Sequence, residues 1–264
     1  MIALLTTLAG CTADPGKDKA PALQALSRFP PQIESEALIL HRLPATCPEQ
    51  AVCREVRSTI AALRQWLGLM DDPPAMPLVV LAQDDPQAAP WAGDLERNHG
   101  CTGCTCSDTG LVLVIGDPCD ARFWTVLRHE TVHHVLHCVT RGRSLPFWFD
   151  EGAATLFEPG VDEHLKPLPN PDRLALIRYL CKTRSSLGLS RLIQKTQQPY
   201  ASGLSYAEVW AITAYLHDTD RSPAPFVQAI RDGQNPMTAF RTAFPDLAVP
   251  SDLEQRVRQW LLSL

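Results

Sequence analysis

The 264 residues carry a net charge of −5, with 45% hydrophobic and 20% charged residues. A chain of this length and composition can bury a full-sized core and is typical of an ordinary globular protein. The mildly acidic balance and the lack of a basic cluster argue against a nucleic-acid partner.

The N-terminal apolar run ends in the tetrapeptide Leu-Ala-Gly-Cys, closing at Cys11, which resembles the lipobox of bacterial lipoproteins. In that class the signal is cut before the cysteine, and the new N-terminal cysteine carries lipid. The run is too short to span a bilayer and has no Lys or Arg, so the true translation start can lie upstream. We expect residues 1–11 to be a lipoprotein-type signal and residues 12–32, rich in Ala and Pro, to be a tether. The protein would then be exported and anchored to the membrane by this lipid, in the periplasm or at the outer membrane.

Cysteine usage agrees with export. The chain has nine cysteines, and lipidation of Cys11 leaves nine minus one, or eight, which can pair completely. An even set fits an oxidising compartment, although the sequence does not give the connectivity. Only a bridge from Cys47 to Cys53, across a turn-like loop, is expected specifically. The disulfide candidates are Cys47, Cys53, Cys101, Cys104, Cys106, Cys119, Cys138 and Cys181.

The segment HGCTGCTC, residues 99–106, also allows a second metal site. A CxxCxC pattern alone is weak, and the thiols of an exported chain are more often oxidised than metal-bound. Disulfides are therefore favoured here over metal. The ligands of the metal alternative would be His99, Cys101, Cys104, Cys106 and Cys119.

From residue 33 onward, apolar runs alternate with amphipathic segments. The pattern predicts strands at 37–42, 77–83 and 111–116, and helices at 51–69 and 121–139. The segment between the second and third strands reads as irregular. Asp117 or Asp120 can cap the second helix.

The rest of the chain reads as helical, with candidate helices at 172–183, 205–217, 224–232, 236–243 and 251–263. We therefore expect one α+β domain over residues 33–264. Residues 33–140 would form a small N-terminal β-sheet with helices, the last of which carries the motif described next. Residues 141–264 would form a C-terminal helical bundle.

Residues 128–140 read RHETVHHVLHCVT, in which His129, Glu130 and His133 form an HExxH arrangement. At about 100° per residue, His133 lies about 40° around the helix from His129 and one turn along. Both imidazoles can therefore reach one ion. Glu130 lies on the flank of the same face, where it can take a proton from a zinc-bound water whose pKa the ion lowers towards about 7.

The other histidines of this helix are excluded as ligands. His137 follows His129 by a rise of about 12 Å, whereas two zinc ligands cannot lie much more than about 4 Å apart. His134 points about 100° away from His133, so it is expected to support the site or to lie at the surface. A metzincin pattern fails because Leu and Val occupy its glycine and final histidine positions.

Seventeen residues separate His133 from Glu151, which lies within the segment LPFWFDEGAATLF. HETVHH followed by P-x-W-[aromatic/Leu]-x-E-G-x-A resembles the gluzincin (peptidase MA-like) zinc metallopeptidases, in the form of a small bacterial lipoprotein. The resemblance implies that Glu151 is the third zinc ligand. Phe149 replaces the usual Leu, and Phe147 and Trp148 are expected to be core residues that seat the Glu151 helix.

The resemblance extends more weakly to the C-terminal helices, and it implies further roles. A gluzincin commonly supplies a tyrosine or histidine that donates to the oxyanion, for which Tyr206 is the first candidate and Tyr200 the second. A packing role for Tyr206 stays open. In this family the strand before the catalytic helix, here 111–115, lines the cleft and can pair with an extended peptide.

The sequence thus predicts a zinc metallopeptidase with one Zn²⁺ per chain, acting on a peptide or protein substrate. Glu130 would activate the zinc-bound water and pass its proton to the leaving amine. The alternative is a catalytically inactive zinc-binding scaffold or a peptide-binding lipoprotein. The presence of Glu130 argues against this alternative, because a structural metal site does not need it. A hydrolase of non-peptide amides would keep the same residues.

Overall fold

The computed structural model describes residues 31, 33–40, 48–69, 71, 73–82, 102–106, 110–183, 187–194 and 203–264. The fold of these residues is α+β, as predicted, with a small mixed sheet of five strands and helices over most of the remainder. Several predictions fall outside the described residues: the signal, most of the tether, Cys11, Cys47, His99, Cys101 and Tyr200. No helix in the described ranges is long and apolar enough to cross a membrane.

The sheet has the strand order β1-β2-β3-β5-β4. Its central strands β2, β3 and β5 run parallel, and the outer strands β1 and β4 are antiparallel to their neighbours. All five residues of β5 are buried, which is typical of a strand covered on both faces. The strands are β1 (Ile33–Ser35), β2 (Leu38–Leu40), β3 (Met76–Leu81), β4 (Thr102–Cys106) and β5 (Leu111–Ile115).

Two strands, β1 and β4, were not predicted. The stretch before β5 was expected to be irregular, but its residues TGCTC form β4, paired with β5 from Thr102↔Ile115 to Cys106↔Leu111. Its composition, with Gly and without large apolar residues, gives no strand signal by itself. Pairing with β5 and packing against helix α4 supply the stabilisation that its own sequence lacks.

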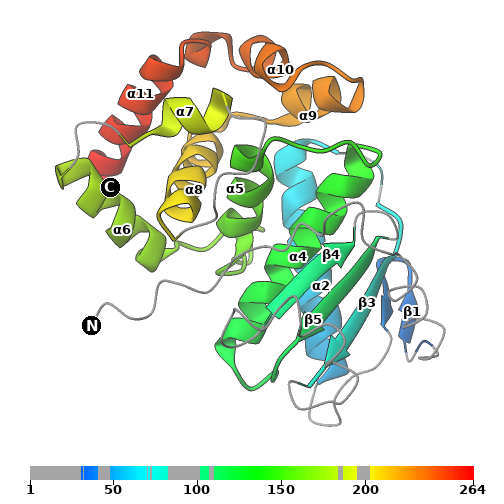
Figure 1. Ribbon diagram of the computed structural model, residues 1–264. Helices are drawn as coiled ribbons and strands as arrows, with labels where there is room; N and C mark the ends of the chain where they lie inside the picture. Colours follow the sequence, from blue (N-terminus) through cyan, green and yellow to red (C-terminus); the bar gives the residue numbers. More distant parts are fainter. Residues whose placement is uncertain are drawn as a thin grey trace.

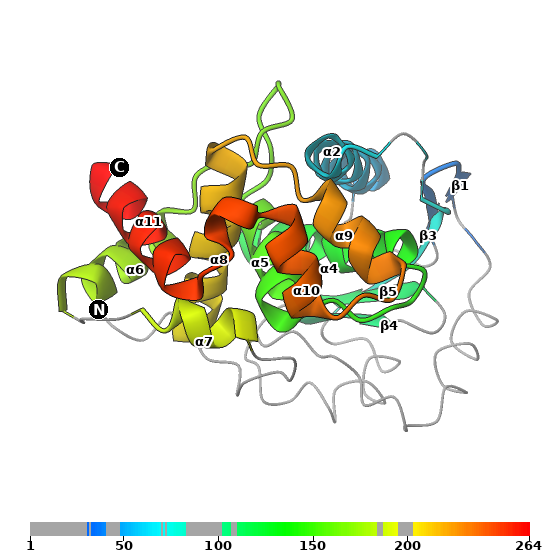
Figure 2. The same cartoon turned by 90° about the horizontal axis from the view of Figure 1, so that it is seen from above.

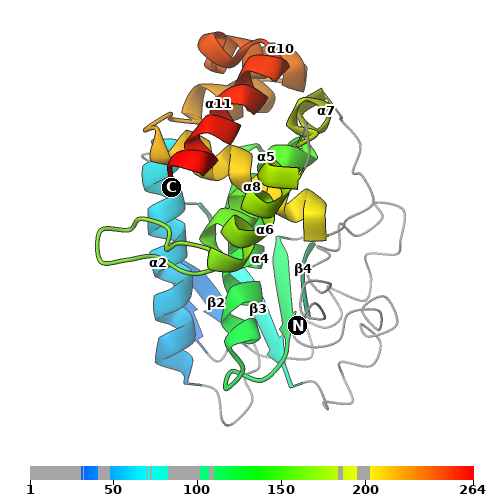
Figure 3. The ribbon, with the colours of Figure 1, turned by 90° about the vertical axis from the view of Figure 1, so that its left-hand side faces the viewer.

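Two long helices, α2 and α4, lie side by side along the sheet (Figure 3). The other helices form the second half of the chain (Figure 1), where α5, α6, α7 and α11 pack around α8 (Figure 2). The helices are α2 (Glu49–Leu67), α4 (Ala121–Val139), α5 (Phe147–Phe157), α6 (Pro171–Thr183), α7 (Leu189–Gln194), α8 (Gly203–Asp218), α9 (Ala224–Arg231), α10 (Pro236–Ala243) and α11 (Pro250–Ser263), with a 3-10 turn at Pro245–Leu247.

The core seats helix α5 as expected. Phe147 and Trp148 are buried, and the Trp148 ring contacts Phe226 and Phe240 at centroid distances of 5.3 and 5.6 Å. Phe149 contacts Phe226 at 5.1 Å. Helix α5 is therefore fixed by aromatic contacts with α9 and α10, immediately before its Glu151.

The cysteines give no support for the disulfide predictions where their side chains are described. The thiols of Cys53, Cys119, Cys138 and Cys181 are free, and burial raises the pKa of Cys53, Cys138 and Cys181. The partner expected for Cys53 lies outside the described residues. The pairing therefore stays a prediction, as does the alternative metal site, of which only Cys104 and Cys119 have described side chains.

Gly152 sets the close approach of α5 to α8. A Cβ there would lie 2.7 Å from Thr213 Cγ2 and 2.8 Å from the Val209 carbonyl oxygen, while the Thr213 hydroxyl donates to the Gly152 carbonyl at 2.8 Å. We expect Gly152→Ala to lower the free energy of unfolding by about 1–3 kcal/mol, because two packed helices must separate. Thermal or urea unfolding measures this change.

Adding Thr213→Ser to the Gly152→Ala protein is the matched control. It removes the methyl group that the new Cβ meets, keeps the hydroxyl and leaves the Val209 carbonyl in place. It should recover part of the lost stability. Unchanged stability of the single variant would show that the two helices do not approach as closely as the structure has them.

Candidate metal centre

Helix α4 carries the HExxH residues, and its beginning is well defined. Asp120 is its N-cap, with the side-chain carboxylate accepting from the Arg122 backbone N–H at 2.9 Å. The cap is thus Asp120, one of the two predicted candidates. The helix ends at Val139, as predicted.

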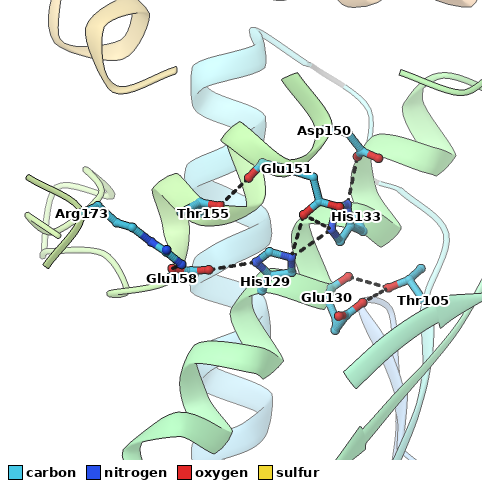
Figure 4. A network of polar contacts seen from close by, with 9 residues as sticks. All are labelled: Thr105, His129, Glu130, His133, Asp150, Glu151, Thr155, Glu158 and Arg173. Carbon is cyan, nitrogen blue, oxygen red and sulfur yellow. Dashed lines mark hydrogen bonds and ion pairs between the residues drawn. The ribbon is translucent and has the colours of Figure 1, made fainter. Parts of the chain in front are cut away.

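The structure brings the three predicted ligands together (Figure 4). The Nε2 atoms of His129 and His133 lie 3.1 Å apart. Glu151 Oε2, from α5, lies 3.3 Å from His129 Nε2 and 3.6 Å from His133 Nε2. Ligand atoms of a single zinc ion at about 2.0–2.2 Å would be separated by similar distances. This buried group could hold a metal ion.

The hydrogen bonding of the three ligands fits a cation. His129 Nδ1 faces Glu158 Oε1 at 3.2 Å, and His133 Nδ1 faces Asp150 Oδ1 at 2.9 Å. Carboxylates accept from Nδ1–H, so in the neutral tautomer each Nε2 carries a lone pair. Glu151 Oε2 is buried and has no hydrogen-bond partner. Three electron-pair donors therefore converge on one point, where a cation would satisfy all of them.

The supporting carboxylates were missed by the sequence analysis. A metal-ligating histidine usually donates its second N–H to such a group, which fixes the ring. Asp150 precedes the predicted ligand Glu151 directly, and Glu158, the C-cap residue of α5, follows Glu151 by seven residues, or about two helical turns, on the same side. Glu158 is held in turn by Arg173, whose Nη2 lies 3.4 Å from Glu158 Oε2. Helical periodicity was the signal that could have found Glu158.

The carboxylates alter how the ligands titrate when no metal is bound. Burial disfavours a charge on His129, but contacts with Glu151 and Glu158 outweigh it and raise its pKa to about 9. The pKa of His133 also rises well above its usual value, because Asp150 and Glu151 outweigh its burial. The two histidines hold the pKa of Glu151 far below its usual range despite its burial. The carboxylates therefore favour a protonated imidazole in the metal-free site at neutral pH, and because the two Nε2 atoms lie 3.1 Å apart, only one of them can carry a proton between the rings.

Metal binding should consequently weaken as the pH falls. Protonation of His129 contributes its full stabilisation of the metal-free fold below pH 6.5, the pKa of this histidine in the unfolded chain. The contribution is lost as the pH rises through about 9, its pKa in the folded protein. Since a ligand imidazole must be neutral, the metal displaces this proton below pH 9. We expect affinity to fall at least about 10-fold per pH unit from pH 8 to pH 6. Competition with a chelator at several pH values measures it, and a flat profile would contradict the site chemistry.

Glu130 lies beside the ligand group and is buried, with 4% of its surface exposed. Its carboxylate points towards strand β4 and accepts from the Thr105 hydroxyl at 2.8 Å (Figure 4). The residue therefore stands next to the ligands without belonging to the group they form, as the sequence predicts. Thr105 was not recognised, because β4 itself was not.

The remaining predicted residues take other places. The ring nitrogens of His134 face the carbonyl oxygens of Gly110 and Pro74, so this histidine supports the fold. Tyr206 is buried on α8, with its ring below the Arg173 guanidinium at 5.5 Å and beside Phe147. This places Tyr206 next to a residue that holds Glu158, and its role as an oxyanion donor stays a prediction.

The strand expected to pair with a peptide needs a correction. β5 is hydrogen-bonded to β3 on one side and to β4 on the other, so neither of its edges is open. The last strand of the described sheet is β4, which packs against α4 and carries Thr105 beside Glu130. Of the two edge strands of the described sheet, β1 and β4, it is β4 that lies beside Glu130, so an extended segment near the site would add next to β4.

Comparison with known proteins found no match, either among protein-family models or among curated proteins. The gluzincin resemblance therefore depends on the motif residues themselves.

Proposed function

We propose that the protein is a zinc-dependent metallopeptidase of the gluzincin type. The observation that carries the proposal is the convergence of His129, His133 and Glu151 with Glu130 adjacent on the same helix. A structural metal site needs only ligands. A buried carboxylate beside the ligands is what a hydrolytic site needs in addition.

The donor set favours zinc. Two imidazoles and one carboxylate are the ligands of a known class of catalytic zinc site, which leaves a further coordination position open. Magnesium and calcium prefer sites made of oxygen ligands. When bound, zinc would polarise a carbonyl group and lower the pKa of a water molecule to about 7.

The protein's own residues would supply the rest of the chemistry. Glu130 takes a proton from the attacking water and returns it to the nitrogen of the leaving amine. Glu158 and Asp150 keep the rings of His129 and His133 in one orientation and one tautomer. Tyr206 is the proposed donor to the developing oxyanion.

An extended peptide would be held by adding to the edge of β4. Backbone hydrogen bonds at this edge would bind many sequences and bring the peptide alongside α4. The proposal also keeps the lipidated, exported form of the chain expected from Cys11 and the disulfides expected from its other cysteines. Lipid analysis of the expressed protein tests the anchor.

Two other functions use the same residues. An inactive scaffold would keep the ligands and make no use of Glu130, and a hydrolase of non-peptide amides would differ only in its substrate. The test compares, on a mixed peptide library, the zinc-loaded protein with its Glu130→Gln variant. Cleavage of peptides by the zinc-loaded protein and not by the Glu130→Gln variant supports the peptidase function. Cleavage of small acyl amides alone supports the third function.

A further inference from the structure

We propose that Thr105 is a positioning residue for Glu130, so that strand β4 holds the general base in place. The Thr105 Oγ1 atom lies 2.8 Å from Glu130 Oε2 and 3.1 Å from the Glu130 carbonyl oxygen. The two residues are 25 positions apart in sequence. The inference rests on the proposed function, because it concerns the residue that would act as base there.

The contact exists because β4 lies unusually close to α4. A Cβ on Gly103 would come within 2.5 Å of Val126 Cγ1 and 2.7 Å of Glu130 Cγ, distances that real Cβ atoms do not show. Residues two apart in a strand face the same side, so Gly103 and Thr105 both face α4. Gly103 lets the strand approach, and Thr105 then reaches the carboxylate.

The hydroxyl restricts a side chain that would otherwise be free to rotate. Glu130 has three side-chain torsions, and a carboxylate displaced by about 1 Å can cost about 100-fold in rate. Donation from Thr105 fixes Oε2 against β4 and leaves Oε1 to accept the proton. The hydroxyl has one proton, which the carboxylate Oε2 at 2.8 Å and the Glu130 carbonyl oxygen at 3.1 Å share, with Oε2 the nearer acceptor.

The two variants that test this are Thr105→Val, which keeps the branched shape and loses the hydroxyl, and Thr105→Ser, which keeps the hydroxyl. The first readout uses the zinc-loaded protein and needs no substrate. Acetohydroxamic acid loses a proton as it chelates a metal, and a neighbouring carboxylate can accept that proton. Azide binds metals as an anion with no proton to lose.

Thr105→Val should weaken the binding of acetohydroxamic acid by about 10-fold or more. This is the range seen when a supporting hydrogen bond to a metal site is lost. Thr105→Ser should stay within about 3-fold of the unchanged protein, and azide should bind all three proteins equally. In a Glu130→Gln background, Thr105→Val should have no further effect. On a cleaved peptide, kcat should fall about 10- to 100-fold with KM unchanged.

Equal hydroxamate binding by the Val variant and the unchanged protein would overturn the proposal. An equal loss of hydroxamate and azide binding would also overturn the proposal, as would an equal loss of hydroxamate binding in the Thr105→Val and Thr105→Ser variants. Either result would indicate a general structural effect. If Glu130→Gln does not change hydroxamate binding or peptide cleavage, the proposed function fails instead. A thermal-unfolding cycle of Thr105→Val and Glu130→Met on the metal-free protein tests the coupling without zinc, because Met removes the acceptor at nearly the same size, and additive shifts would overturn the contact.

Discussion

Replacing Glu130 with Gln should lower kcat/KM for peptide hydrolysis by about 1,000-fold, within the range that general acid–base catalysis contributes, while the zinc content stays unchanged. The amide has nearly the same shape as the carboxylate but cannot accept the proton of the attacking water. Glu130 is not a member of the group formed by His129, His133 and Glu151, so metal binding should survive. Peptide-library cleavage and metal analysis of the same sample measure both quantities.

A matched control is Glu163→Gln, which makes the same chemical change at an exposed carboxylate, 86% accessible, far along the chain from the helix. It should leave both activity and zinc unchanged. Full activity in the Glu130→Gln protein would exclude Glu130 as the base. If the unchanged protein and the Glu130→Gln variant both hold zinc and neither cleaves any peptide, the scaffold function replaces the peptidase.

The helix that carries the motif could be predicted almost completely from the sequence. Its bounds, its Asp120 cap and the pairing of His129 with His133 all follow from local rules of capping and helical period. Exclusion of His134 from the ligand group also follows, because its direction on the helix is fixed by the same period. These are properties of one segment, and no distant part of the chain alters them.

Prediction of the third candidate ligand needed more than local rules. Glu151 was inferred from the family resemblance, and its convergence with the histidines depends on how α5 crosses α4 and on the close contact of Gly152 with α8. Glu158 lies on the same face of α5 as Glu151, yet a sequence does not show which face of a helix meets which neighbour. Helical period alone places Glu158 two turns beyond Glu151, but its contact with His129 became visible only when the packing was known.

Strand β4 could not be predicted, and the strand assigned to substrate was wrong for the same reason. Its sequence has no alternation of apolar and polar residues, so its strand state comes from pairing with β5 and from the absence of a side chain at Gly103. A short sequence with weak intrinsic preference takes its structure from its neighbours. The strand next to Glu130 with a sheet edge is therefore β4, and not β5 as predicted.

The second large effect concerns the ligand that comes from another helix. We expect Glu151→Ala to reduce zinc affinity by more than about 100-fold, which exceeds the 10- to 100-fold typical of a lost supporting residue. Glu151 supplies the only carboxylate of the ligand group, and its Oε2 is buried without a hydrogen-bond partner. Its loss removes one coordinating atom and the negative charge that offsets a dication. Chelator competition at fixed pH gives the affinity.

The size of this loss should be compared with that of Glu158→Gln, which changes the partner of His129 Nδ1 and of Arg173 but no predicted ligand, and should cost about 10- to 100-fold. This order follows from the structure, since Glu158 touches the ring while Glu151 faces the ligand atoms. Circular dichroism must show that both variants are folded, because both carboxylates are buried. Equal affinities for the Glu151→Ala and unchanged proteins would mean that zinc binds somewhere else. A larger loss for Glu158→Gln than for Glu151→Ala would mean that Glu158, and not Glu151, is the third ligand.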